Sequence, residues 1–167
     1  MGGFEIPVVG RVSVLRAFNV LRQYDAGEVG SAWAQMQSRL TPRGVLVEGT
    51  CDELGRLSSW VCLGRHQPLS LTISMSLRHL HRPSDLAARL PKVLIHDNVP
   101  GQPIHAFLAS LDAAWLRHAP LATFGARQRF VASARTMRDE GWPIMGSAAR
   151  WRLGELSVDW SAVAPRA

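Results

Sequence analysis

The sequence predicts an α/β fold: a partial doubly wound sheet in which a β-α-β unit is followed by an antiparallel extension and helices. Three observations support this. Two apolar runs flank an amphipathic stretch, two strand-like runs joined by short turns follow, and helical patterns fill most of the remainder. With 167 residues and 47% hydrophobic side chains, the chain can bury one core. We expect a single domain over 1–167, with the β-α-β core at 1–55 and the antiparallel strands, helices and final strand at 56–167.

The first predicted strand is VSVLRAFNVL, residues 12–21, a near-continuous apolar run of the kind that is buried on both faces of a parallel sheet. DAGE at 25–28 has the form of a capping box, in which Asp accepts backbone N–H groups and Glu reaches back. The helix that begins there carries four apolar residues on one face, Val29, Trp33, Met36 and Leu40. We expect TPRG, 41–44, to end it and VLVEGT, 45–50, to form the second, parallel strand.

The pattern changes after Cys51. DELGR at 52–56 and RHQP at 65–68 are typical of turns, and each is followed by a strand-like run, LSSWVCLG at 57–64 and LSLTISMSL at 69–77. Because the connections are this short, the two runs are expected to pair antiparallel and to extend the sheet.

Three helical stretches follow. PSDLAARL, 83–90, offers Ser84 as a cap, PIHAFLASLDAAWLRHA begins at Pro103 with one apolar face, and a third helix spans about 126–140. The face of the middle helix consists of Ile104, Phe107, Leu108, Leu111 and Trp115. The last predicted strand is RWRLGELSVDW, 150–160, whose apolar alternation slips at Gly154 and so predicts a β-bulge there.

The formal net charge of +6 makes nucleic acid a candidate partner, because clustered cations release counterions from phosphates. Only Lys92 among the 19 basic residues is a lysine, and the arginines are spread along the chain. The densest group lies on the third predicted helix: Arg127, Arg129, Arg135 and Arg138. The alternative is a solvated basic face with no nucleic-acid partner.

The chain has no apolar run of about 18 residues and no signal-peptide pattern at MGGFEIPVVG, so we expect a soluble, cytoplasmic protein without a membrane span. Cys51 and Cys62 form neither a CxxC pair nor a disulfide framework, which fits free thiols in a reducing compartment.

Five strings along the chain carry a resemblance to a known family: GGFEIP, RAFNVLRQYD, GVLVEGTCDELGR, LPKVLIHDNVPG and RWRLGELSVDW. In this order they resemble the C-terminal part of uncharacterised bacterial class I S-adenosylmethionine-dependent methyltransferases. The resemblance implies a Rossmann-like fold, in which 12–21 matches the fourth strand and 45–50 the fifth strand of a seven-stranded doubly wound sheet. It also implies that the loop from Asn19 to Tyr24 lies beside the reactive methyl group and its acceptor.

The sequence departs from that family in its cofactor-binding features. The Gly-rich turn and the acidic residue that hold S-adenosylmethionine are not found, and DELGR predicts a turn where the family has a helix. We therefore expect the acceptor-side half of a methyltransferase, truncated or degenerate, which binds S-adenosylmethionine only if an upstream segment or a partner chain completes it. The rival interpretation is a non-enzymatic, Arg-rich module that binds RNA or another protein.

Eight residues are candidates for the site. The candidate catalytic residues are Asn19, Tyr24 and Glu48, and the candidate substrate-binding residues are Arg22, Gln23, Asp52, His96 and Asn98. Asn and Tyr after a buried strand can orient a nucleophile, and ligands of open α/β sheets bind outside the carboxyl ends of the strands, where Glu48 is expected. In IHDNVPGQPIH, a His is a candidate base and Asp97 could orient it.

Structural alternatives remain open for each candidate. Asn19 and Gln23 can satisfy loop backbone groups, Tyr24 can pack on the sheet edge, and Glu48 can lie at the surface or pair with Arg56. Turn chemistry explains the loop that contains His96 and Asn98 equally well. His79 and His81 would share a strand face, but no third ligand is near in sequence, so no metal site is expected.

A sheet that begins with 12–21 leaves one edge of this strand open, and an open edge favours aggregation unless something covers it. The segment FEIPVV could fold back as an edge strand, or two copies of the chain could pair. Pro7 withholds a backbone donor from FEIPVV, so we expect a homodimer.

Overall fold

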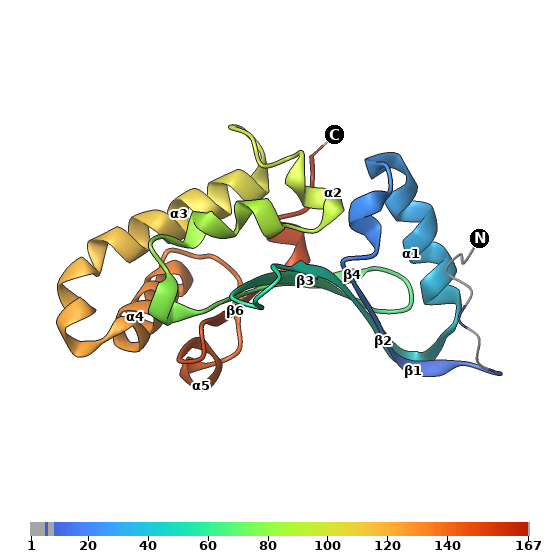
Figure 1. Cartoon of the computed structure of the whole chain (residues 1–167), viewed down its shortest axis with the longest axis horizontal. Coiled ribbons are helices and arrows are strands. Elements are labelled where there is room, and N and C mark those ends of the chain that lie inside the picture. The colour runs from blue at the N-terminus through green and yellow to red at the C-terminus, as the bar shows by residue number, and fades with distance from the viewer. Residues whose placement is uncertain (1–5, 7–8, 167) are drawn as a thin grey trace.

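The computed structural model describes residue 6 and residues 9–166. Its six strands form one mixed sheet with the order β1-β2-β3-β4-β6-β5 (Figure 1). Helices α1, α2 and α3 lie on one side of the sheet, and α5 lies on the other. The α/β class predicted from the sequence is therefore confirmed. Most of FEIPVV, and with it the fold-back alternative for this segment, lies outside the described residues.

The β-α-β unit is confirmed. It consists of β1 (Val12–Phe18), α1 (Val29–Ser38) and β2 (Leu40–Cys51), and its two strands pair in parallel. The predicted capping box is present, because the Asp25 backbone N–H donates to a Glu28 carboxylate oxygen over 2.9 Å. The predicted apolar face of the helix is buried.

The predicted end of this helix is wrong: TPRG belongs to β2. Val12 of β1 pairs with Leu40 and Val14 pairs with Val45, so residues 41–44 form an irregularity in the ladder. Pro42 and Gly44, which were expected to end the helix, lie at this irregularity within the strand. Pro42 is exposed, and Gly44 packs against the Val12 carbonyl group.

The prediction that the first strand is buried on both faces is also wrong. β1 is one of the two edge strands of the sheet formed by the described residues, and Ala17 is its only buried residue. The Val14 side chain is 66% exposed, because β1 has one neighbouring strand among the described residues and few helix contacts. Hydrophobic residue types alone did not distinguish an edge strand from a central strand.

The antiparallel extension is confirmed. β3 (Leu57–Leu63) pairs antiparallel with β2 on one side and with β4 (Pro68–Met75) on the other. β6 (Glu155–Asp159) follows beside β4, and β5 (Ile144–Met145) is the last strand of the sheet.

Helices fill most of the chain between Pro83 and Asp139. They are the 3-10 helix η4 (Pro83–Arg89), α2 (Lys92–Ile95), α3 (Pro103–Arg117), the 3-10 helix η5 (Ala119–Phe124) and α4 (Ala126–Asp139). The apolar face predicted for α3 is buried throughout. Ser84 does not cap η4: its backbone N–H donates to Asp112 of α3, and Asp85 accepts from the Arg82 backbone instead.

The last predicted strand divides into two elements. A helical turn, α5 (Ala148–Trp151), precedes β6, and the two are joined by a turn at Gly154 with φ near +83°. The predicted bulge at Gly154 is therefore wrong. The alternation of apolar residues changes phase at Gly154 because Trp151 lies in helix α5, whereas Leu156 and Val158 lie in strand β6. All three side chains are buried.

The core lies between the sheet and the helices. One row of side chains crosses it from strand to strand, with Ala17, Glu48, Val61, Leu71 and Val158 in register, and all five are buried. Glu48 is the one ionisable member of this row. Among the described residues, no helix has the length and apolar character needed to span a bilayer.

Candidate functional site

The carboxyl ends of three strands meet at one edge of the sheet. β1 and β2 are parallel, and β4 runs the same way because it is antiparallel to β3, which is antiparallel to β2. The loop after β1, the turn after β2 and the segment after β4 therefore lie along the same edge, called here the carboxyl edge. Ligands of open α/β sheets bind in this position.

Asn19 joins the ends of β1 and β2. Its φ of 59° lies in the left-handed region, which Asn tolerates better than most residues. The Asn19 side chain accepts a hydrogen bond from the Cys51 backbone N–H over 3.0 Å, and its amide group lies 3.3 Å from the Cys51 sulfur. The Asn19 backbone N–H also donates to the Gly49 carbonyl group over 2.8 Å. In this conformation the Asn19 side chain is used to hold the two strand ends together.

The rest of the loop is fixed by Leu21, which is fully buried. Arg22 and Gln23 are exposed on the short 3-10 turn η1 (Leu21–Gln23), and Tyr24 is half-buried, with its backbone N–H donating to Leu21. The loop thus presents Arg22 and Gln23 to solvent close to the carboxyl edge.

Glu48 lies in the core. Its side chain is 1% exposed, and neither carboxylate oxygen has a hydrogen-bond partner of ordinary geometry among the described residues. Burial raises the pKa of Glu48 from 4.5 to about 7, and the nearby indole N–H of Trp33 lowers it only in part. Pairing of Glu48 with Arg56 is not observed, since Arg56 is exposed in the β2–β3 turn. The carboxyl group is buried away from any substrate at the surface.

Asp52 shapes the turn after β2. One of its carboxylate oxygens accepts from the Arg56 backbone N–H over 2.7 Å, and its backbone N–H donates to Leu57. Asp52 also lines a cavity of about 220 Å³ at the carboxyl edge.

This cavity gathers ionisable side chains from three segments: Asp52 and Arg56 from the β2–β3 turn, His79 and His81 after β4, and Asp85 from η4. Imidazole and carboxylate groups are the side chains that most often act as general acids and bases in proteins. No group of three or more His, Cys, Asp or Glu residues in the described part of the chain is arranged to hold a metal ion.

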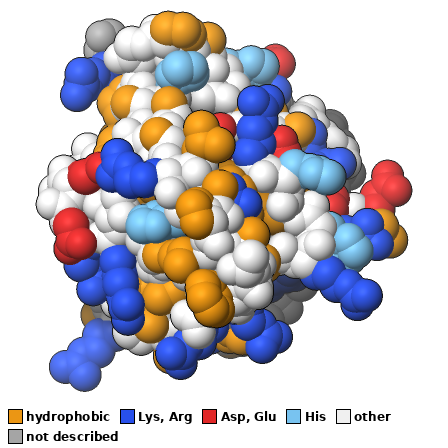
Figure 2. Space-filling view, turned by 90° about the vertical axis from the view of Figure 1, so that its left-hand side faces the viewer, with side chains coloured by type: hydrophobic (Ala, Val, Ile, Leu, Met, Phe, Trp, Pro, Cys, Tyr) orange, Lys and Arg blue, Asp and Glu red, His pale blue; other side chains and the backbone are white. Residues whose placement is uncertain are grey.

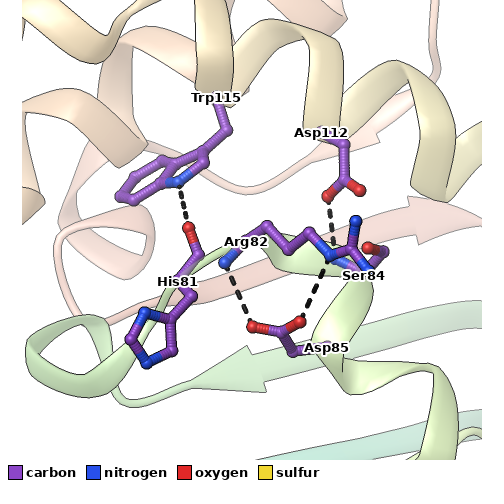
Figure 3. Close-up of polar contacts among 6 residues, drawn as sticks. All are labelled: His81, Arg82, Ser84, Asp85, Asp112 and Trp115. Atoms are coloured by element: carbon purple, nitrogen blue, oxygen red, sulfur yellow. Dashed lines mark hydrogen bonds and ion pairs between the residues drawn. The ribbon is translucent and has the colours of Figure 1, made fainter.

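The segment that carries His81 is anchored to α3 (Figure 3). The Trp115 indole N–H donates to the His81 carbonyl group over 2.9 Å, and the Ser84 N–H donates to Asp112 over 2.8 Å. Asp85 accepts from both the backbone and the guanidinium group of Arg82. Figure 3 shows the His81 ring on the other side of its backbone from Trp115, so these contacts hold the backbone and leave the ring free.

The sequence did not indicate that this histidine pair lines a cavity. His79 ends a 3-10 turn (Leu77–His79) and His81 follows it, so the two residues do not share a strand face as predicted. The anchoring contacts come from α3, which is remote in the sequence, and no local pattern reveals them.

His96 and Asn98 lie in a different place from the cavity. His96 is exposed after α2, whereas Asn98 lines a smaller cavity of about 170 Å³ together with Ser84, His105 and Asp112. The Asn98 side-chain oxygen is buried without a hydrogen-bond partner among the described residues. The structure thus brings Asn98 and His105 together but does not bring His96 to them.

Comparisons with family models, with curated proteins and with solved structures give no match to this chain.

Proposed function

We propose that the chain is the acceptor-side half of a Rossmann-like, S-adenosylmethionine-dependent methyltransferase, and that the cavity at the carboxyl edge receives the methyl acceptor. The observation that carries the proposal is the position of His79, His81, Asp52 and Asp85 around one cavity outside the ends of β2 and β4. The β-α-β unit and the loop from Asn19 to Tyr24 on the same edge support it, as does the resemblance of the sequence.

In this proposal a histidine is the general base. A neutral imidazole of His79 or His81 takes the proton from the hydroxyl or amine of the acceptor, and a neighbouring carboxylate stabilises the imidazolium ion that forms. The anchored backbone from His81 to Asp85 keeps these groups in place, which favours in-line positioning of the acceptor.

The described residues do not by themselves fit S-adenosylmethionine. A carboxylate that accepts from ribose hydroxyls must be accessible and available. The carboxylate of Glu48 is buried in the core, and those of Asp52 and Asp85 already accept from the backbone N–H groups of Arg56 and Arg82. The Asn19 side chain is engaged by Cys51. No step of the reaction is therefore assigned to the cofactor, and the proposal places its binding on an upstream segment or a partner chain.

Among the described residues, β1 pairs with a strand on one side only, and this supports a second element of the proposal, a homodimer in which two β1 strands pair. The exposed Val14 and Arg16 are on this strand. We further propose that the protein acts in the cytoplasm, which agrees with free thiols at Cys51 and Cys62.

Titration calorimetry with S-adenosylmethionine tests the division into halves. The chain alone is expected to bind the cofactor no more tightly than about 1 mM. Tighter binding would contradict the proposal that another segment holds the cofactor.

The coding DNA on the 5′ side of the Met1 codon provides the complementary test. We expect a strand, a Gly-rich turn and a helix to be encoded there or in an adjoining gene.

Together with this segment, the chain is expected to transfer tritium-labelled methyl groups. Replacing both His79 and His81 by Phe should then lower the rate at least about 100-fold. His66→Phe, in the exposed β3–β4 turn, is the matched control. An unchanged rate in the double variant would refute the role of the cavity.

A further inference from the structure

A second, larger cavity lies beside the first, and the two share Ser76. Its volume is about 510 Å³, and its lining comes from the segment after β4, the start of α4 and the turn before β6. Arg78, Arg127 and Arg152 converge on it from these three segments, together with Phe124 and Leu153. None of its lining residues is acidic. The cavity therefore combines three positive charges with apolar walls.

The three arginines are exposed and make no side-chain hydrogen bond or ion pair within the described part of the chain. Other arginines nearby are structural. Arg129 donates to the Trp115 carbonyl group and stacks on the Trp115 ring. Arg138 donates to the Gly146 carbonyl group and lies over another Trp ring. The basic cluster seen in the sequence is thus divided, and the charge available for a ligand comes from elements remote from one another in sequence.

Phe124 stands between this cavity and a neighbouring one. Its side chain is 74% exposed, and it also lines a second hollow of about 290 Å³ with Gln128 and Arg135 of α4. Leu153, at the other wall, is 63% exposed. Figure 2 views the end of the molecule that carries α4 and shows hydrophobic side chains in a band with Lys and Arg side chains on either side. An exposed aromatic ring among unpaired arginines is suited to stacking a base beside phosphates.

We propose that the two adjoining hollows form a groove for a single strand of nucleic acid. Phosphates contact Arg78, Arg127 and Arg152, one base stacks on Phe124, and the next nucleotide extends toward Arg135. The first turn of α4, which has no side-chain cap, adds positive potential where Arg127 lines the cavity. The larger hollow has the size of a small-molecule site and accommodates one nucleotide. A duplex keeps its base faces stacked and cannot use Phe124.

This inference goes beyond the proposed methyltransferase function and does not rest on it. The groove needs neither the cofactor nor His79 and His81, so the two proposals can fail separately.

Fluorescence anisotropy of a labelled single-stranded RNA of about eight nucleotides tests the groove in the full chain. At about 50 mM salt the strand should bind, and log affinity should fall with log salt with a slope near −2, as expected for three phosphate contacts on a single strand. The variant with Arg78, Arg127 and Arg152 all replaced by Gln should lose most of this slope. Phe124→Leu keeps an apolar side chain and should weaken binding about tenfold without changing the slope.

Arg43→Gln is the matched control, because Arg43 is exposed at the opposite end of β2 and its loss removes one charge. It should change affinity by less than about twofold. Circular dichroism of every variant should match that of the unaltered chain, since the four substituted residues of the groove are exposed.

The proposal would be overturned by no binding at low salt, by equal weakening from Arg43→Gln and from Arg127→Gln alone, by equal affinity for a duplex of the same length, or by competition from an acidic peptide as strong as that from RNA. Affinity for uridine monophosphate equal to that for the strand would also overturn it, and would assign the site to a free nucleotide.

Discussion

At the scale of single residues, two polar side chains near the same strand ends serve opposite purposes. Asn19 satisfies its hydrogen-bonding capacity on Cys51 and holds a backbone conformation that most residues avoid. Glu48 is buried with no such partner among the described residues, and its carboxyl group is held neutral over most of the acid range. One residue stabilises the fold, whereas the other makes its stability depend on pH.

Replacing Glu48 by Gln is expected to stabilise the protein at pH 8 and to change little at pH 4.5. The pKa of Glu48 is about 7 in the fold, above the 4.5 of an unperturbed group, so the unfolded chain loses this proton first as pH rises. The contribution of the neutral carboxyl is therefore fully present below pH 4.5 and is lost as the pH rises to 7. The Gln side chain does not ionise, so the substitution removes this loss of stability, which is about 3 kcal/mol. Urea denaturation at both pH values measures it.

Glu53→Gln is the control for this experiment, because Glu53 is exposed in the β2–β3 turn and should give the same difference at each pH. If Glu48→Gln also gave equal differences at pH 4.5 and pH 8, the interpretation of Glu48 as a buried neutral acid would be wrong.

Two substitutions at Asn19 separate its two roles. Asn19→Gly keeps the left-handed conformation but removes the contacts to Cys51, and it should cost about 1 kcal/mol of stability. Asn19→Ala loses the contacts and also strains the backbone, so it should cost about 2 to 3 kcal/mol. Thermal or chemical unfolding measures both. Equal losses would show that the backbone conformation at this position carries no strain.

At the scale of elements, the junction between α5 and β6 is held by close backbone contact. Gly154 has φ near +83°, its carbonyl group accepts from the Met75 N–H over 2.9 Å, and a Cβ at this position would overlap the Met75 carbonyl oxygen. The end of β4 and the start of β6 can approach this closely only at glycine.

Gly154→Ala should therefore destabilise the fold by about 3 kcal/mol or more, since both the backbone conformation and the space exclude a side chain. Gly30→Ala is the matched control. Gly30 lies in α1, where a Cβ would meet no other atom within 4 Å, and alanine there should stabilise by about 0.5 to 1 kcal/mol. Differential scanning calorimetry measures the melting temperatures of both variants. A melting temperature of Gly154→Ala at or above that of the unaltered chain would contradict the close contact between Gly154 and Met75.

At the scale of the whole molecule, the sheet is asymmetric. Among the described residues, one of its edge strands is β1, seven residues long with one buried residue, and the other is β5, only two residues long. A long edge offers many unpaired backbone groups, whereas a short edge offers few. Association through strands is therefore expected at β1.

Sedimentation velocity at micromolar concentration is expected to give about twice the chain mass. Val14→Asp, at a side chain that is 66% exposed, should leave the folded monomer intact but oppose pairing of two β1 strands through like charges. Ser13→Asp is less informative because it is nearer the irregular end of the ladder. A monomer in the unaltered protein would show that β1 does not pair between copies.

Local signals in the sequence predicted the local structure. The capping box at Asp25 and the turn at 52–56 are set by residues within a few positions of one another, and both are observed. Burial of β1 could not be predicted, because it depends on which strands and helices lie beside it. The cavity that contains His81 could not be predicted either, because Trp115, 34 residues away, holds that segment. The methyltransferase resemblance stays a prediction from the sequence.

The position of β6 within the sheet has a consequence for synthesis on the ribosome. β4 ends at Met75, but β6, its second neighbour in the sheet, begins only at Glu155. Leu71 of β4 therefore cannot pair with Val158 until β6 has been synthesised. The first four strands can pair in the order in which they emerge, because each pairs with the strand before it, but one side of β4 stays open until residues 155–159 have been made. During that interval a row of apolar side chains and unpaired amides is accessible, so binding by chaperones is most needed before the final strand arrives.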